Sequence, residues 1–134
     1  MRFSAFAVLL LAVATYAGDS RDAAFERLAR AGVFAFGRVS YAGFISQGQK
    51  DYEAILTSSS ALATFEKLYA VGNPQAKSYA LVGIRSLSPS RFRELSQTAS
   101  TSKEEVVTQE GCIVYHEAFG VIVRRMENGK YLRR

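Results

Sequence analysis

The sequence is poor in the residues on which disulfide bonds, metal sites and many active sites depend. Its 134 residues include one cysteine, Cys112, and one histidine, His116. A single cysteine cannot form an internal disulfide bond, and a structural zinc site takes four ligands, mostly nitrogen or sulfur atoms. The sequence therefore predicts no internal disulfide bond, no metal site and no bound cofactor.

The sequence also lacks the short motifs of several common enzyme chemistries. It contains no glycine-rich phosphate loop, no GxSxG nucleophile elbow and no P-loop. Glu104 with Glu105, and Asp51 with Glu53, are carboxylate pairs that general acid–base catalysis could use, but helix starts and solvated faces account for such pairs more often. We therefore predict a protein that is not an enzyme, with a thiol- or carboxylate-dependent enzyme as the alternative.

Cys112 and His116 are the candidates for catalytic residues, because a thiol and an imidazole in hydrogen-bond contact can act as nucleophile and base. Side chains four residues apart can meet on a helix, whereas four residues of a strand span about 13 Å. Residues 112–116 have the composition of a strand, so we expect the two side chains to lie too far apart. Free cysteine is among the most buried residue types, and we therefore predict an interior strand with a buried thiol.

The longest apolar run stands at the start of the chain, in MRFSAFAVLLLAVATYAG. Arg2 precedes a nearly unbroken apolar run, 3–14, and small residues offer two cleavage points, after Ala14 or after Ala17. A secretory signal peptide has this layout. Crossing a bilayer takes about 20 apolar residues, which is more than this run provides. We predict a cleaved signal peptide over residues 1–17 and no stable membrane span after cleavage.

The remaining residues, 18–134, have the length of a single small globular domain, which we expect in the periplasm or secreted. Positive charge is moderate and scattered: the formal net charge is +5, and the adjacent basic pairs are Arg124–Arg125 and Arg133–Arg134. Proteins that bind nucleic acid concentrate lysine and arginine on one face, so we predict no nucleic-acid partner. The charge fits a weak attraction to anionic surfaces. The expected partner is another protein or a component of the cell envelope.

The clearest secondary-structure signal is a pair of helices in the middle of the chain. Apolar residues of 60–71 recur at helical spacing, and Gly72 is placed to end this helix. Asn73 followed by proline predicts the start of a second helix, 74–87, which is apolar around most of its circumference and therefore central in the domain. Gly83 inside that helix predicts close approach of another backbone.

The segments on either side of these helices have strand character. Alternating apolar residues over 34–45 predict a strand with bends at Gly37 and Gly43. Residues 104–108 and 112–116 are rich in β-branched and aromatic residues and predict two short strands. The sequence therefore predicts pairing between the early segment and the two late strands.

Together these patterns predict an α+β fold that is mainly helical. It contains a central helical hairpin, further short helices and a small β element formed by the 34–45 and 104–116 segments. An all-α fold is the alternative.

Four aromatic residues crowd the glycine-containing segment 34–45. They are Phe34, Phe36, Tyr41 and Phe44. Core packing explains such a cluster most simply, and a partly exposed groove for a peptide or glycan is the functional alternative.

The helical pair Ser60 to Leu87, with its tight Gly-Asn-Pro turn, resembles one unit of a HEAT-type helical repeat. The resemblance covers 28 residues, against the roughly 40 of a full repeat, and no second copy follows. HEAT arrays are protein-binding scaffolds, so the resemblance implies an interaction role. It implies no individual functional residue. Our expectation is thus an exported, non-catalytic binding protein, with a structural envelope protein attracted to anionic surfaces as a further alternative.

Overall fold

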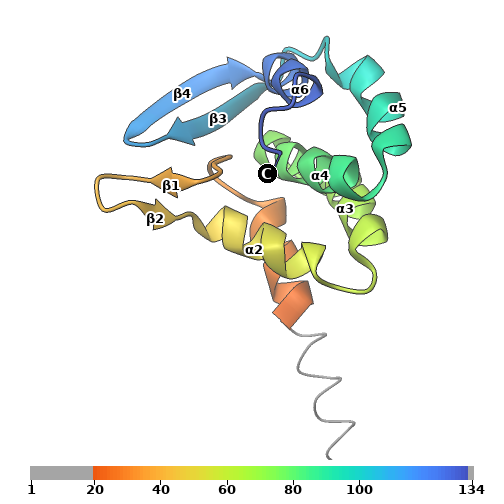
Figure 1. The fold of residues 1–134 in the computed structure, drawn as a ribbon, viewed down its shortest axis with the longest axis horizontal. Helices are drawn as coiled ribbons and strands as arrows, with labels where there is room; N and C mark the ends of the chain where they lie inside the picture. The colour runs from red at the N-terminus through yellow and green to blue at the C-terminus, as the bar shows by residue number, and fades with distance from the viewer. Residues whose placement is uncertain (1–19, 133–134) are drawn as a thin grey trace, which may run out of the picture.

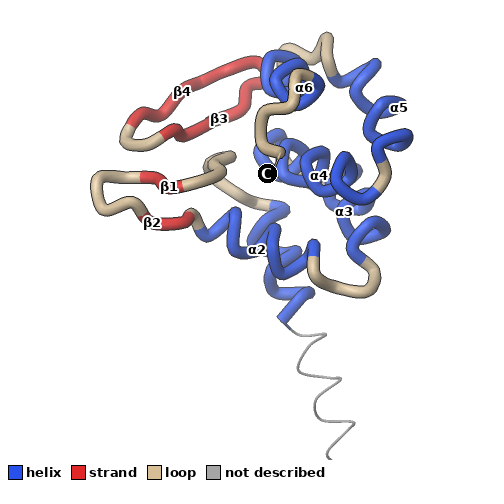
Figure 2. The backbone as a smooth tube through the Cα atoms, in the orientation of Figure 1, coloured by secondary structure: helices blue, strands red, loops and turns tan. Residues whose placement is uncertain are grey.

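The computed structural model describes residues 20–132. The predicted signal peptide, 1–17, and Arg133–Arg134 lie outside the described residues. The fold is α+β and mainly helical, as predicted: helices pack together on one side, and two small β-hairpins extend from them (Figures 1 and 2). The all-α alternative is wrong.

Residues 20–29 are helical, and the remaining elements follow in one chain order. They are β1 (Arg38–Val39), β2 (Phe44–Ile45), α2 (Gln47–Leu56), α3 (Ala61–Val71), α4 (Pro74–Leu87), α5 (Pro89–Ala99), β3 (Glu105–Glu110), β4 (Ile113–Ala118) and α6 (Phe119–Glu127). The helical hairpin α3–α4 has the bounds that the local sequence signals predict. The resemblance of this hairpin to a HEAT unit stays a prediction.

Helix α4 is the centre of the domain, as its apolar circumference predicts. It contacts α2, α3, α5, α6 and β3, and every residue from Ser78 to Arg85 is buried. Its start is fixed by Asn73, whose side chain accepts a hydrogen bond from the backbone N–H of Ala76 at 2.9 Å. The proline at its first helical position needs no N–H there.

Gly83 allows a close approach, but of a side chain and not of the predicted backbone. A Cβ at this position would lie within 2.6 Å of three ring atoms of Phe65 on α3. Phe65 is fully buried, and its ring fills the space that the missing side chain leaves. The glycine thus brings α3 and α4 together at one aromatic residue.

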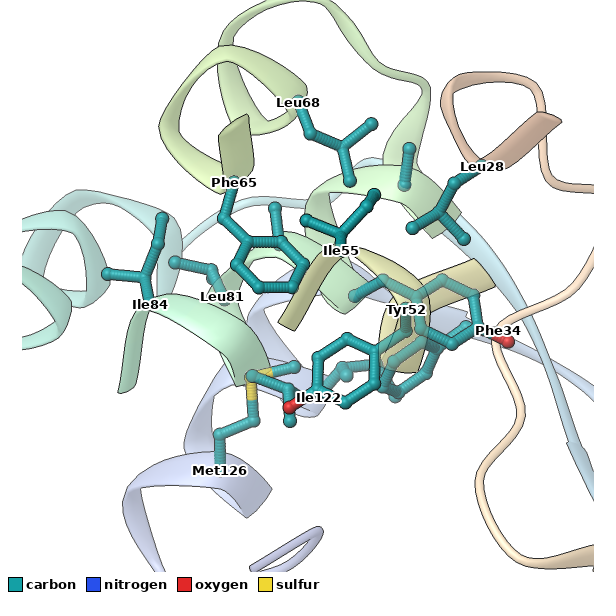
Figure 3. Packing of buried hydrophobic residues seen from close by; sticks show 14 of the residues in the cluster. Leu28, Phe34, Tyr52, Ile55, Phe65, Leu68, Leu81, Ile84, Ile122 and Met126 are labelled. Atoms are coloured by element: carbon teal, nitrogen blue, oxygen red, sulfur yellow. The ribbon is translucent and has the colours of Figure 1, made fainter. Parts of the chain in front are cut away.

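The core joins residues from most helices to the base of β3. Leu28, Ile55, Phe65, Leu81 and Ile122 are fully buried and belong to one cluster (Figure 3). Burial of an aliphatic or phenyl side chain contributes about 1.5–3 kcal/mol each. The helices and the base of β3 therefore provide the packing on which the hairpins depend.

The predicted pairing between the early and late β segments is confirmed. The backbone N–H of Phe34 donates to the carbonyl of Val107 at 2.8 Å, and that of Gln109 donates to the carbonyl of Phe34 at 3.2 Å. Isolated parallel bridges join Phe34 with Thr108 and Val39 with Gly111. These bonds hold the hairpins β1–β2 and β3–β4 side by side (Figure 1).

The prediction of one bent strand over 34–45 is wrong in detail. The segment reverses direction and forms the antiparallel hairpin β1–β2, with Val39 opposite Phe44. Ser40 and Gly43, both in the left-handed region at φ 62° and 68°, reverse the chain between the two strands. Gly37, at φ 83°, provides the predicted bend before β1.

Candidate binding surface

Large apolar side chains are exposed mainly on the two hairpins. Tyr41 is fully exposed in the turn of β1–β2, and Phe44 follows on β2. On β4, Ile113, Val114 and Tyr115 are exposed in succession. The turns of both hairpins point away from the helices, on the same side of the molecule (Figure 1). We call the residues Tyr41, Phe44, Ile113, Val114 and Tyr115 the hairpin surface.

Cys112 lies in the two-residue turn between β3 and β4, and its exposure contradicts the predicted buried thiol. Gly111, at φ 58°, takes the first position of this turn, where glycine is favoured. A Cβ at Gly111 would have no atom within 4 Å, so the space beside this residue is open, although its carbonyl accepts a hydrogen bond from the backbone N–H of Ser40 at 2.8 Å. The hairpin extends past the helices, so its outer residues do not pack against the helical core (Figure 1).

The predicted interior strand is likewise wrong for β4. In β3, Val106 and Thr108 are buried against the helices. In β4, by contrast, residues 113–116 are all exposed, so both faces of this strand meet solvent. The apolar residues of β4 thus contribute to the surface and not to the core.

The outer edge of β4 is open for backbone hydrogen bonding. Val107 and Gln109 direct their bonding groups toward Phe34, so the alternate residues of β3 bond to β4. Their partners in the register are Ile113, Tyr115 and Glu117. It follows that Val114 and His116 direct their N–H and C=O groups away from β3.

A cleft of about 500 Å³ lies between the two hairpins and the C-terminal residues. Its walls combine aromatic and amide side chains with one ion pair, from Phe34, Phe36, Gln49, Gln109, Glu110, Lys130 and Tyr131. The aromatic groove predicted from Phe34, Phe36, Tyr41 and Phe44 is therefore divided. Phe34 and Phe36 line this cleft. Tyr41 and Phe44 belong to the hairpin surface.

Tyr131 closes the cleft from the C-terminal side. Its ring lies edge-on to that of Phe34, with centroids 5.1 Å apart, and 5.8 Å from that of Phe36. Burial among these rings raises the pKa of the Tyr131 hydroxyl. Its backbone is left-handed at φ 68°, a conformation that costs about 1–2 kcal/mol outside glycine and that the aromatic packing offsets.

Carboxylates along the β3–β4 hairpin are each held by a basic side chain. Glu110 pairs with Lys130, and His116 Nδ1 lies 2.9 Å from Glu105. Glu117 binds Arg125 at 2.5 Å and accepts from the Thr108 hydroxyl at 2.9 Å. Hydrogen bonding to Arg125 is the main reason why the pKa of Glu117 is lowered.

The structure does not bring Cys112 and His116 together. They lie four residues apart along an extended hairpin, which corresponds to about 13 Å, and the imidazole instead contacts the carboxylate of Glu105. A catalytic thiol must be accessible, and Cys112 is exposed. It must also contact its base, and the distance between Cys112 and His116 does not allow this contact. Cys112 is thus a surface thiol at a hairpin turn.

Carboxylates of the two candidate catalytic pairs take part in ion pairs with basic side chains of other elements. Asp51 is buried and binds the guanidinium of Arg27 at 2.6 Å, whereas Glu104 pairs with Lys77 on α4. Within residues 20–132, no three histidine, cysteine, aspartate or glutamate residues are grouped so that they could hold a metal ion. These carboxylates stabilise contacts between elements.

Arg85 is a cation whose burial the sequence does not reveal. One of its nitrogens donates to the carbonyl of Met126 at the end of α6, while Nε and Nη2 have no hydrogen-bond partner among the described residues. Its guanidinium lies over the ring of Phe92. Burial lowers the pKa of Arg85. This cation serves the carbonyl end of a helix, where positive charge is favourable.

No helix within residues 20–132 combines the length and the apolar character that crossing a membrane requires. The exposed apolar residues of the hairpin surface and the neighbouring cleft are the candidate sites of contact with other molecules. Comparison of the whole chain with protein-family models, with curated proteins and with solved structures finds no match.

Proposed function

We propose that this protein is an exported, non-catalytic binding protein, and that its two hairpins contact another protein or a component of the cell envelope. The observation that carries the proposal is the concentration of exposed large apolar residues on the hairpin surface. Contiguous apolar patches on small globular proteins often mark interaction sites. Tyrosine and phenylalanine are also enriched at such sites.

The predicted signal peptide over residues 1–17 supports the exported part of the proposal, with a periplasmic or secreted location. The resemblance of Ser60 to Leu87 to a HEAT unit supports an interaction role. Neither feature identifies the partner.

Attraction to an anionic surface is the second candidate function, and one local feature favours it. Residues 33–50, which include the β1–β2 hairpin, contain Arg38 and Lys50 and no acidic residue. An envelope component with negative charge would therefore meet positive charge beside exposed Tyr41 and Phe44.

A retention experiment with matched variants tests both functions. The protein, immobilised away from the hairpins, is exposed to an envelope fraction, and the double variant Tyr41→Ser with Phe44→Ser is compared with Val71→Ser. Val71 is an exposed apolar residue at the end of α3, far from the hairpins in the chain. We expect the double variant to lose reproducible retention and Val71→Ser to keep it. Equal retention by all three proteins would contradict the proposed function.

Ionic strength separates the two candidates. Contact dominated by charge weakens steeply as salt rises, because the Debye length falls from about 10 Å at 0.1 M to about 3 Å at 1 M. Contact dominated by the apolar hairpin surface persists. Retention that salt abolishes would favour the anionic surface.

A further inference from the structure

We propose that β4 pairs antiparallel with β4 of a second copy of this chain, so that two molecules share one continuous sheet. The inference rests on the proposed function, because it assigns one partner to the hairpin surface. Val114 and His116 supply the bonding groups, since they direct N–H and C=O toward the open edge. Residues 113–116 are exposed on both faces, so a second strand meets no obstruction from the described part of the chain.

Strand β4 lacks the devices by which monomeric proteins protect a sheet edge. Such edges are blunted by lysine, proline, β-bulges or very short strands. The sequence of β4 is IVYHEA, without lysine or proline, and its six-residue register with β3 is unbroken. The other exposed strand, β2, is two residues long and is protected by its shortness. Among residues 20–132, the unprotected edge is therefore that of β4.

The residues of β4 favour one register for this pairing. In this register Val114 lies on the two-fold axis, opposite Val114 of the second copy. Ile113 then lies opposite Tyr115 of the second copy, and Tyr115 lies opposite Ile113 of the second copy. Aromatic and β-branched residues form favourable cross-strand pairs. In this register, His116 lies opposite Cys112 and Glu117 opposite Gly111, so no like charges are opposed. The N–H and C=O groups of Val114 and His116, which are directed away from β3, also face the second copy in this register.

The neighbouring registers are less favourable. An axis at Tyr115 places Ile113 opposite the charged Glu117 of the second copy. An axis at His116 places Tyr115 opposite the charged Glu117 of the second copy, so this register also loses the pairing of apolar residues. Charge and apolar pairing together therefore select the axis at Val114.

The expected dimer is weak and reversible. A few residues of one strand per copy bury less than the roughly 800 Å² per partner of a standard interface. The two copies also carry net positive charge, since basic residues outnumber acidic ones in the sequence, and this opposes their approach. We expect dissociation in the micromolar range.

Sedimentation velocity tests the proposal with two matched substitutions, Val114→Lys and Val71→Lys. The two valines are 51% and 62% exposed, so both substitutions add one charge to an exposed site. Val114→Lys places two like charges at the axis, whereas Val71→Lys does not touch β4. The protein is measured from about 1 to about 200 micromolar with a reducing agent, so that Cys112 cannot link the copies covalently.

We expect wild type and Val71→Lys to dimerise with rising concentration, and Val114→Lys to weaken dimerisation by at least about tenfold. A monomer at all concentrations would overturn the proposal. So would a Val114→Lys dimer as tight as wild type. The circular dichroism of Val114→Lys should match that of wild type, because Val114 contributes little to the core.

Amide hydrogen exchange identifies the strand that pairs. In the monomeric Val114→Lys variant, the amide of His116 should exchange fast while that of Tyr115 is protected by β3. In the wild-type dimer, the amides of Val114 and His116 should both become protected. Fast exchange of both in a proven dimer would place the interface elsewhere and overturn the proposal.

The outcome for self-pairing is distinguishable from that for the proposed function. A dimer that Val114→Lys abolishes, with retention unaffected by Tyr41→Ser and Phe44→Ser, would support this inference and contradict the envelope contact. A persistent monomer whose β4 amides are protected only by an envelope protein would overturn self-pairing and support the envelope contact.

Discussion

Tyr79 connects the helical core to the first β segment. Its buried hydroxyl accepts a hydrogen bond from the backbone N–H of Ala35 at 3.0 Å and donates to the carbonyl of Ala35 at 3.1 Å. The hydroxyl of Ser46 also donates to that carbonyl, at 3.1 Å. The N–H of Ala35 thus depends on Tyr79, whereas the carbonyl has a second donor. Burial raises the pKa of the Tyr79 hydroxyl, which remains protonated and able to donate.

We therefore expect Tyr79→Phe to reduce the free energy of unfolding by about 1–3 kcal/mol, because it leaves the buried N–H of Ala35 without a partner. Urea denaturation measures this change. Tyr69→Phe is the control: the Tyr69 hydroxyl has no hydrogen-bond partner among residues 20–132, so its loss should cost less than about 0.5 kcal/mol. Equal effects of the two substitutions would contradict the role of Tyr79.

The contribution of Glu117 to the stability of the folded protein depends on pH. The bond to Arg125 lowers the pKa of Glu117 in the folded protein. This stabilisation is fully present above the ordinary glutamate pKa of about 4.3 and is lost as the pH falls through the lowered value. The bond is charge-assisted but partly exposed, so we take its contribution as about 1 kcal/mol.

We expect Glu117→Gln to reduce stability by about 1 kcal/mol near pH 7 and to have a smaller effect near pH 2, because protonation of the wild-type carboxylate at falling pH removes the same charge. Urea denaturation at the two pH values measures the difference. Glu127→Gln removes an exposed carboxylate of α6 that has no ion-pair partner among the described residues, and it should change stability little at either pH. A pH-independent loss in Glu117→Gln would show that packing, and not charge, is responsible.

The α3–α4 hairpin depends on a contact that helix propensity alone would misjudge. Replacing glycine by alanine inside a helix usually stabilises it by about 1 kcal/mol. At Gly83, however, the added Cβ would lie within 2.6 Å of the buried ring of Phe65. Overpacking of this kind costs about 1–3 kcal/mol or more, which exceeds the gain.

We therefore expect Gly83→Ala to reduce the free energy of unfolding, by about 1–2 kcal/mol. Gly32→Ala is the control, because a Cβ there has no described atom within 4 Å. Combining Gly83→Ala with Phe65→Leu should recover part of the loss relative to the sum of the single variants, which a double-mutant cycle measures. Stabilisation by Gly83→Ala would contradict the close packing of α4 against Phe65.

The helical hairpin could be predicted from the sequence because its signals are local. Gly72 and Asn73 mark the ends of two helices within a few residues, and the asparagine side chain makes the expected cap. The β1–β2 turn could not be predicted in this way. Its first left-handed residue is Ser40, and serine, unlike glycine, seldom adopts this backbone conformation.

The exposure of the candidate site could not be predicted for a different reason. Apolar residues in a strand show that two faces exist, but not whether either face meets a core. Val106 of β3 is buried and Ile113 of β4 is exposed, although both belong to one hairpin. The difference depends on how far the hairpin extends beyond the helices. That distance is a property of the whole fold, and it also explains why Cys112 is exposed.

The whole molecule divides into a packed core and projecting hairpin ends. Ile122 of α6 is fully buried within the core cluster, whereas Ile113 and Tyr115 lie on the exposed part of β4. Folding stability should therefore depend on Ile122, and association should depend on Ile113 and Tyr115. Exposed substitutions usually change stability by less than about 0.5 kcal/mol, and truncation of a buried isoleucine costs about 2–5 kcal/mol.

We expect Ile113→Thr with Tyr115→Thr to leave the free energy of unfolding of dilute protein nearly unchanged, and Ile122→Ala to lower it by about 2–4 kcal/mol. Urea denaturation below the concentration of dimerisation measures both, and an unchanged denaturant slope would show that the surface exposed on unfolding is the same. At higher concentration, association stabilises the wild-type fold by mass action, so its melting temperature should rise with concentration. The melting temperature of the threonine double variant should not rise, because it has lost the side chains that pair across β4. A loss above about 2 kcal/mol in this variant when dilute would show instead that the hairpin end belongs to the core.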